Sequence, residues 1–182
     1  MFPKTVRFLI MAIMAMVVAQ PALAAGSAYD YAFESIDGDA IKLGDHSGKV
    51  LLVVNTATQC GNTHQFGTLQ KAWETYRDQG LVVVGVSSND FGQEPRAGDA
   101  IKDFCSTNYN VDYPMADLTH VRGNDAHPFF KWVEAELGEK GTPSWNFFKY
   151  LIGRDGQIID YFGTVEDPMD KRLRSAIEAA LK

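Results

Sequence analysis

The chain has 182 residues, of which 46% are hydrophobic and 22% are charged, and its formal net charge is −6. These proportions are those of a globular protein and exclude a disordered or collagen-like chain. The net negative charge argues against nucleic acid as a partner, because phosphate binding requires a basic surface. The two cysteines are too few for a four-thiolate zinc site or an iron–sulfur cluster, but they suffice for one redox cycle.

Residues 1–24 have the pattern of a secretory signal peptide. Two basic residues precede an apolar run over residues 8–18, and a small-x-small cleavage site ends at Ala24. The apolar run is too short to span about 30 Å of hydrocarbon as a membrane anchor. We therefore expect cleavage after Ala24 and a periplasmic or secreted location. The mature protein, residues 25–182, is expected not to insert into a membrane.

Strands and helices alternate along residues 25–182. In chain order we expect a hairpin of Tyr29–Ile36 and Ala40–Leu43, a strand Val50–Asn55, a helix Phe66–Gln79, a strand Leu81–Val86, helices Gly98–Asn108 and Ala126–Leu137, a hairpin of Phe147–Ile152 and Ile158–Phe162, and a helix Met169–Leu181. Two continuous apolar runs, Val50–Asn55 and Leu81–Val86, indicate strands that are buried on both faces. The pattern predicts a single α/β domain with a central mixed β-sheet flanked by α-helices.

Cys60 follows the first buried strand and precedes the helix after it. Sites in such sheets gather at the carboxyl ends of the strands. Backbone N–H groups and the helix dipole stabilise a thiolate at this position, and Gly61 permits a tight turn. The alternative is a buried and inert cysteine, which is the commoner state of a free cysteine. Position alone makes Cys60 a candidate reactive thiol.

Three motifs in the chain resemble those of the glutathione peroxidase family. They are residues 54–63 (VNTATQCGNT), 89–95 (NDFGQEP) and 145–151 (WNFFKYL). Each motif is weak alone, but three in the family's order and at fitting separations are a strong signal. The resemblance covers nearly all of the mature chain. It implies a thioredoxin-like fold and a thiol peroxidase of oxidative-stress defence, with no bound cofactor and no metal.

The resemblance also implies roles for individual residues. Cys60 is the peroxidatic residue, which attacks a hydroperoxide and becomes a sulfenic acid. The family places Trp145 and Asn146 beside this cysteine, where their N–H groups would stabilise the leaving oxygen. Without the motif, Trp145 would be read as a core aromatic residue. Asn89 keeps its family identity and is a further candidate donor.

Asp90 departs from the family pattern, which has glutamine at this position. A carboxylate beside a thiolate would raise the pKa of the cysteine by like-charge repulsion. A carboxylate turned away from the sulfur would instead accept a hydrogen bond. Gln93 is a candidate to replace the missing amide, although it matches a later glutamine of the family motif. The aspartate at position 90 therefore predicts an activity that is slower than that of family members with glutamine, or differently tuned.

Cys105 is the second thiol and lies on the expected helix Gly98–Asn108. In thioredoxin-dependent family members, a cysteine in this segment attacks the sulfenic acid and forms an intramolecular disulfide. The resemblance thus implies a resolving role, while a small core residue is the alternative. A disulfide requires Cα atoms about 4.4–6.8 Å apart, so its formation would involve local unwinding of the helix.

Two other functions stay open on the residues alone. Cys60 and His64 have a Cys-x3-His spacing, which would suit a soft metal in a metallochaperone or a thiol sensor without turnover. Two ligands do not make a site, however, and the other histidines show no matching spacing. The second alternative is a non-catalytic descendant in which Asp90 marks a decayed site.

The leading prediction is an exported thiol peroxidase that reduces hydrogen peroxide or organic and lipid hydroperoxides. A two-cysteine cycle favours a thioredoxin-like protein over glutathione as reductant, and export would require a donor outside the cytoplasm. The connection between Trp132 and Trp145 is too short for the segment that tetrameric members use in assembly, so we expect a monomer. Phe91, Trp145 and Phe147 would form an apolar mouth for lipid hydroperoxides.

Overall fold

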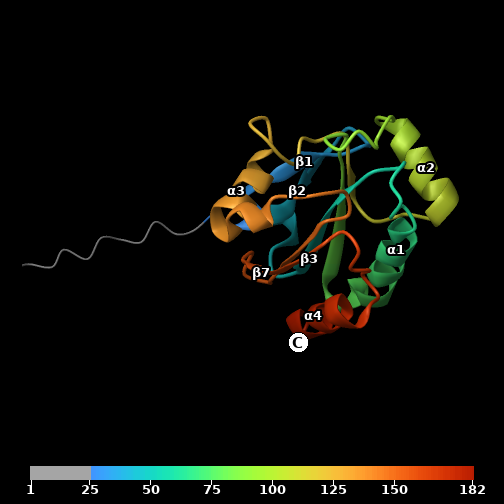
Figure 1. Ribbon diagram of the computed structural model, residues 1–182. Helices are drawn as coiled ribbons and strands as arrows, with labels where there is room; N and C mark the ends of the chain where they lie inside the picture. The colour runs from blue at the N-terminus through green and yellow to red at the C-terminus, as the bar shows by residue number, and fades with distance from the viewer. Residues whose placement is uncertain (1–25) are drawn as a thin grey trace, which may run out of the picture.

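The computed structural model describes residues 26–182, so the predicted signal peptide lies outside the described residues. A five-stranded sheet forms the centre of the fold (Figure 1). In spatial order it contains β5 (Met115–Ala116), β4 (Leu81–Ser87), β3 (Val50–Thr56), β6 (Lys149–Ile152) and β7 (Ile158–Phe162). β3 pairs in parallel with β4 and antiparallel with β6. The prediction of a mixed central sheet is therefore confirmed.

Helices and a small hairpin cover both faces of this sheet. The helices are α1 (Gln65–Tyr76), α2 (Asp99–Tyr109), α3 (Pro128–Leu137) and α4 (Lys171–Ala180), and the hairpin strands are β1 (Ala32–Glu34) and β2 (Ala40–Lys42). Short 3-10 helices are η1 (Ala28–Asp30), η2 (Leu43–His46), η3 (Arg77–Gln79) and η4 (Glu139–Gly141). Figure 1 shows α3 and the hairpin on one side of the sheet and α1, α2 and α4 on the other. None of the helices in this part of the chain is long and apolar enough to cross a membrane.

The central strand β3 supplies side chains to two separate core layers. All seven of its residues are buried. Leu52 and Val54 pack in the layer under α1, α2 and α4, whereas Leu51 and Val53 pack in the layer under α3. Successive side chains of a strand point to opposite faces, so a strand covered on both sides must be apolar throughout. This is why the continuous apolar run predicted a central strand correctly.

The ends of some elements differ from the predicted ones for local reasons. The helix expected from Ala126 begins at Pro128, because a proline fits the first helical turn and the ring of His127 accepts a hydrogen bond there. β6 begins at Lys149 rather than Phe147, since Phe147 has a left-handed φ of 60°. β5 has only two residues, which is too short for a periodic pattern, and the sequence did not predict it.

Lys149 brings a charged side chain into the sheet, where it is 0% exposed. Its Nζ donates hydrogen bonds to the carbonyl oxygens of Phe147 (2.6 Å), Gly163 (3.3 Å) and Thr164 (3.4 Å). Burial lowers the pKa of Lys149 to about 8, although nearby acidic residues oppose this shift. The charged form is thus less stable in the folded protein than in the unfolded chain.

We expect the stability of the wild type to rise with pH, relative to a Lys149→Met variant. The folded lysine releases its proton near pH 8, while the unfolded chain retains it to about pH 10.4. The unfolded state therefore binds more protons in this window, and stability increases through it. Urea unfolding should show a relative rise on the order of 1 kcal/mol between roughly pH 7 and pH 9. Lys131→Met, at an exposed position of α3, is the control and should show no such change. A wild-type-to-Lys149→Met difference that is the same at both pH values would contradict the expectation.

Candidate active site

Cys60 lies in the turn that connects β3 to α1. The backbone N–H of Thr63 donates to the carbonyl oxygen of Cys60 at 3.0 Å, and the Thr63 hydroxyl donates to the same oxygen. The Cys60 side chain packs in the core layer that contains Phe66, and the residue is 7% exposed. The turn thus fixes the cysteine backbone and leaves only a small part of the residue in contact with solvent.

Asn62 supplies the hydrogen-bond donors that contact the sulfur of Cys60. Its backbone N–H lies 3.5 Å from Sγ, and its side-chain Nδ2 lies 3.9 Å from Sγ. Donors in these positions stabilise negative charge on the sulfur. The sequence indicated backbone donors before the helix, but not the Asn62 side chain. Its role depends on the turn geometry, and a spacing of two residues after a cysteine gives no distinctive signal.

Asn55 of β3 fixes the segment that carries Trp145 and Asn146. Its Nδ2 donates to the carbonyl oxygen of Trp145 at 3.1 Å, and its Oδ1 accepts from the N–H of Phe148 at 2.9 Å. The backbone oxygen of Asn55 accepts a further bond from the N–H of Phe147 at 2.6 Å. These three bonds hold the segment against the end of the central strand.

Asn146 is fully buried and hydrogen-bonds to Gln93. Its Nδ2 donates to Oε1 of Gln93 at 2.9 Å, and the backbone oxygen of Gln93 accepts from the N–H of Gln59 at 3.0 Å. Gln93 therefore connects Asn146 to the residue before Cys60. Within residues 26–182, neither Asn146 nor Trp145 donates a hydrogen bond to Sγ. The hydrogen bond between Gln93 and Asn146 thus joins the second and third motifs. Gln93 is the residue that we considered as a replacement for the amide missing at position 90.

Trp145 is 41% exposed, so the alternative that it is a core aromatic residue is wrong. Its ring packs against Phe91 with centroids 5.3 Å apart. Phe147, by contrast, is 0% exposed and packs edge-to-face against Phe66. Of the three residues expected to form an apolar mouth, Phe91 and Trp145 pack together, whereas Phe147 lies in the core.

Asp90 binds the 120–122 loop rather than the sulfur. One carboxylate oxygen lies 2.7 Å from Nδ1 of His120, and the other accepts from the N–H groups of Val121 (2.6 Å) and Arg122 (3.2 Å). Hydrogen bonding to Asp90 and its charge raise the pKa of His120. Both oxygens are thus used away from Cys60. Of the two effects considered for position 90, the geometry supports the accepted hydrogen bond and not the repulsion of a thiolate.

Glu94 is a buried carboxylate that ties the second motif to the Cys60 loop. It accepts hydrogen bonds from the N–H (2.7 Å) and the hydroxyl (2.5 Å) of Thr58 and from the N–H of Arg96 (3.1 Å). The Arg96 guanidinium also donates to the Thr58 hydroxyl at 2.7 Å. Asn89 accepts from the N–H of Glu94 at 3.0 Å, so its side chain shapes this loop. The sequence did not single out Glu94 or Arg96, because a carboxylate in a loop usually faces solvent.

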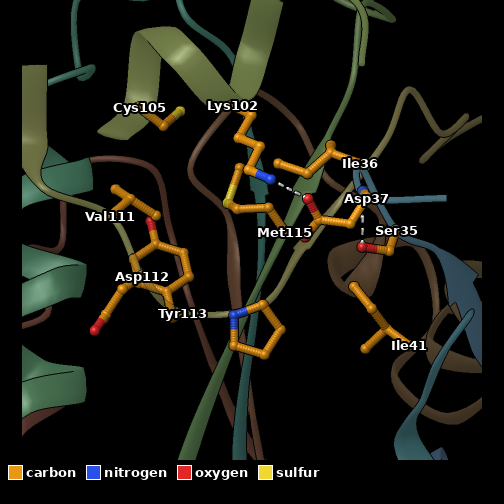
Figure 2. A pocket seen from close by; sticks show the side chains of 11 residues that line it. Ser35, Ile36, Asp37, Ile41, Lys102, Cys105, Val111, Asp112, Tyr113 and Met115 are labelled. Carbon is orange, nitrogen blue, oxygen red and sulfur yellow. Dashed lines mark hydrogen bonds and ion pairs between the residues drawn. The ribbon is translucent and has the colours of Figure 1, made fainter. Parts of the chain in front are cut away.

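Cys105 lies on α2 and is 1% exposed. Burial raises the pKa of its thiol to about 12, and the charge of Glu94 acts in the same direction while that of Arg96 opposes it. A hollow of about 350 Å³ beneath α2 is lined by Cys105 but not by Cys60 (Figure 2). Both cysteines are free thiols in this structure and belong to the same core layer. The folded Cys105 is therefore a protonated and shielded thiol at neutral pH.

The Cys60–His64 pair gains no third ligand. His64 is exposed immediately before α1, and its side chain makes no capping hydrogen bond. Across the described residues, no group of three or more His, Cys, Asp or Glu side chains could hold a metal ion. The hypothesis of a metal-binding function therefore rests on the same two residues as before.

The chain matches known proteins along most of its length. A family model for glutathione peroxidase matches residues 28–134. The glutathione peroxidase of Lactococcus lactis subsp. cremoris is 41% identical over 154 residues, which cover 82% of this chain and 98% of the relative. The hydroperoxy fatty acid reductase gpx1 of Synechocystis sp. is 39% identical over 149 residues, which cover 77% of this chain and 88% of the relative.

The structural comparison agrees with these matches. The crystal structure of Trgpx in apo form has a TM-score of 0.69 and 32% sequence identity to this chain, and the match covers 87% of this chain and 97% of that one. Together with the mixed sheet and its flanking helices, this likeness confirms the thioredoxin-like α/β fold. The relatives favour peroxidase activity in oxidative defence over a metallochaperone or a sensor without turnover. The chain is a peroxidase and belongs to the glutathione peroxidase family.

Proposed function

We propose that this thiol peroxidase reduces hydrogen peroxide and organic or lipid hydroperoxides with Cys60 as the peroxidatic residue. The observation that carries the assignment is the pair of Asn62 donors on Sγ at the strand-to-helix turn. The thiolate attacks the terminal oxygen of the hydroperoxide, and the O–O bond breaks. The sulfur becomes a sulfenic acid, and the leaving oxygen takes a proton to give an alcohol or water.

The leaving oxygen carries developing negative charge, which nearby donors stabilise. The indole N–H of Trp145 and the side-chain amide of Gln93 are the donors that we assign to it. Trp145 is 41% exposed, and the side-chain oxygen of Gln93 accepts a hydrogen bond from Asn146. Neither N–H group donates to an acceptor in the described part of the chain, so both are available to a substrate. In this assignment Asn146 positions Gln93.

We expect Cys60→Ser to abolish the fast reaction with peroxide and Asn62→Ala to slow it about tenfold. A hydrogen bond to a charged group is worth about 1.5–3 kcal/mol, and the backbone donor of position 62 remains in Asn62→Ala. Stopped-flow oxidation of the reduced protein by hydrogen peroxide measures both effects. Asn108→Ala, at an exposed position of α2, is the control and should match the wild type. A wild-type rate equal to that of free cysteine would refute the assignment.

We propose Cys105 as the resolving residue. Its sulfur would attack the Cys60 sulfenic acid, form a disulfide and release water, and a thioredoxin-like dithiol protein or glutathione would then reduce the product. Because the folded thiol is buried with a pKa of about 12, the attack requires local opening of α2. The contacts that hold α2 in place include the guanidinium of Arg96 over the ring of Phe104 at 4.6 Å and the Lys102–Asp37 ion pair.

One equivalent of peroxide should consume both thiols of the wild type but only one thiol of Cys105→Ser. The variant retains a sulfenic acid that dimedone traps, whereas the wild type forms a disulfide that mass spectrometry detects. In the reduced wild type, iodoacetamide at neutral pH should modify Cys60 before Cys105, since burial keeps the latter protonated. Unchanged turnover of Cys105→Ser with a dithiol reductant would show that Cys105 does not resolve the intermediate.

We propose that the protein is a monomer, and the short connection between α3 and β6 supports this proposal. That connection contains the single turn η4 and a short loop, so it holds no additional segment for assembly. The proposed enzyme thus meets its reductant as a single chain.

We further propose that residues 1–24 direct export and are then removed, which the basic start, the apolar run and the cleavage site of the sequence support. Expression of the full chain in a bacterium should give an extracytoplasmic protein whose N-terminus is Ala25. Ile13→Arg places a charge in the apolar run and should retain the full-length chain in the cytoplasm, while Thr5→Ala should be exported normally. Intact-mass measurement of each cell fraction distinguishes these outcomes, and a full-length wild type in the cytoplasm would contradict the proposal.

A further inference from the structure

A cation that the proposed peroxide chemistry does not use lies next to the Phe91–Trp145 pair. The guanidinium of Arg122 lies over the ring of Phe91, 5.3 Å from its centroid, and Phe91 in turn packs against Trp145. Arg122 is exposed, and within residues 26–182 its guanidinium forms no ion pair. The three side chains therefore form a continuous surface with a free positive charge at one end.

Asp90 determines where this cation lies. Its carboxylate accepts the backbone N–H groups of both Val121 and Arg122, and the Val121 side chain is buried at 1% exposure. The buried side chain of Val121 and the hydrogen bonds to Asp90 thus hold the loop in place. A carboxylate has a second oxygen for Nδ1 of His120, which an amide could not provide as an acceptor. The residue type at position 90 accordingly fixes the base of the Arg122 side chain.

The charges around Arg122 leave it available to an anion. Arg122 and Glu139 both line a shallow hollow of about 340 Å³, and Glu139 is the acidic residue of its lining. Arg122 and Glu139 form no ion pair with each other. An apolar chain would pack on the rings of Phe91 and Trp145, while a carboxylate on that chain would meet the guanidinium.

We propose that Arg122 is a specificity-determining residue for hydroperoxides that carry a carboxylate, and that Asp90 is the positioning residue that holds it beside Phe91. The inference rests on the proposed function, in that Cys60 reduces the hydroperoxide. The expected preference is modest, because a guanidinium–carboxylate contact at an exposed position remains partly screened by water.

The test compares a C18 fatty acid hydroperoxide with its methyl ester, both below the concentration at which they form micelles. The two probes share the hydroperoxide and the chain and differ in the charge. Stopped-flow kinetics give the rate constant for oxidation of the reduced protein by each probe. The wild type should react about fivefold faster with the acid than with the ester, and added salt should reduce this ratio. The ratio is measured within each variant, so a general loss of activity cancels.

Arg122→Gln should bring the ratio of acid to ester close to one, and Arg122→Lys should restore part of it. Asp90→Ala should lower the ratio as Arg122→Gln does, whereas Asp90→Asn keeps an acceptor for the loop N–H groups and should retain part of it. The matched control is Arg77→Gln, which removes an exposed arginine that lies 5.9 Å from the ring centroid of Trp73. This control should keep the wild-type ratio.

Distinct results would overturn the inference and the function on which it rests. A wild-type ratio of one, or a ratio that survives in Arg122→Gln, overturns the role of Arg122 even if hydrogen peroxide oxidises the protein rapidly. A ratio that survives in Asp90→Ala overturns the positioning role of Asp90. Oxidation of the wild type by hydrogen peroxide at the rate of free cysteine would instead overturn the proposed peroxidase chemistry of Cys60.

Discussion

The buried side chain of Asn55 is the constraint on which the arrangement of the site depends. It stands near the end of β3, where the strand stops but the backbone of the third motif still needs hydrogen-bond partners. Its amide donates to the carbonyl of Trp145 and accepts from the N–H of Phe148. A buried amide that loses such partners is costly, by about 1–3 kcal/mol for each unsatisfied group. The position of Trp145 follows from this pairing.

The two thiols lie in the same core layer but have different surroundings. Cys60 lies at a turn where the backbone N–H and the side-chain amide of Asn62 contact the sulfur. Cys105 lies within α2, where the helical N–H groups are already used, and its burial raises the thiol pKa to about 12. The donors beside Cys60 and the apolar surroundings of Cys105 support the proposal that Cys60 is the reactive thiol and Cys105 the protected one. Separate roles in one redox cycle require this difference.

The sequence predicted the central strands and the place of Cys60 because both follow from local patterns. A run of apolar residues indicates a doubly covered strand, and the strand's end indicates the site. The direction of the Asp90 side chain could not be predicted in this way, since it depends on the loop 30 residues later. The same holds for Glu94, whose partner Thr58 is 36 residues away. Such long-range pairs leave no periodic signal, and the resemblance to a family gave no indication at the position where this chain departs from it.

Glu94 and Arg96 connect the two halves of the proposed redox cycle. Both bind Thr58 in the loop before Cys60, and the charges of both act on the thiol of Cys105. The guanidinium of Arg96 also stacks on Phe104, the residue before Cys105. Because burial, together with the charge of Glu94, raises the pKa of Cys105, the folded helix keeps that thiol protonated. The proposed opening of α2 would break the stacking contact and move Cys105 away from Glu94. It would thereby remove both the burial and the repulsion that oppose ionisation of the thiol. The same movement that would bring the second sulfur to the first would therefore also activate it.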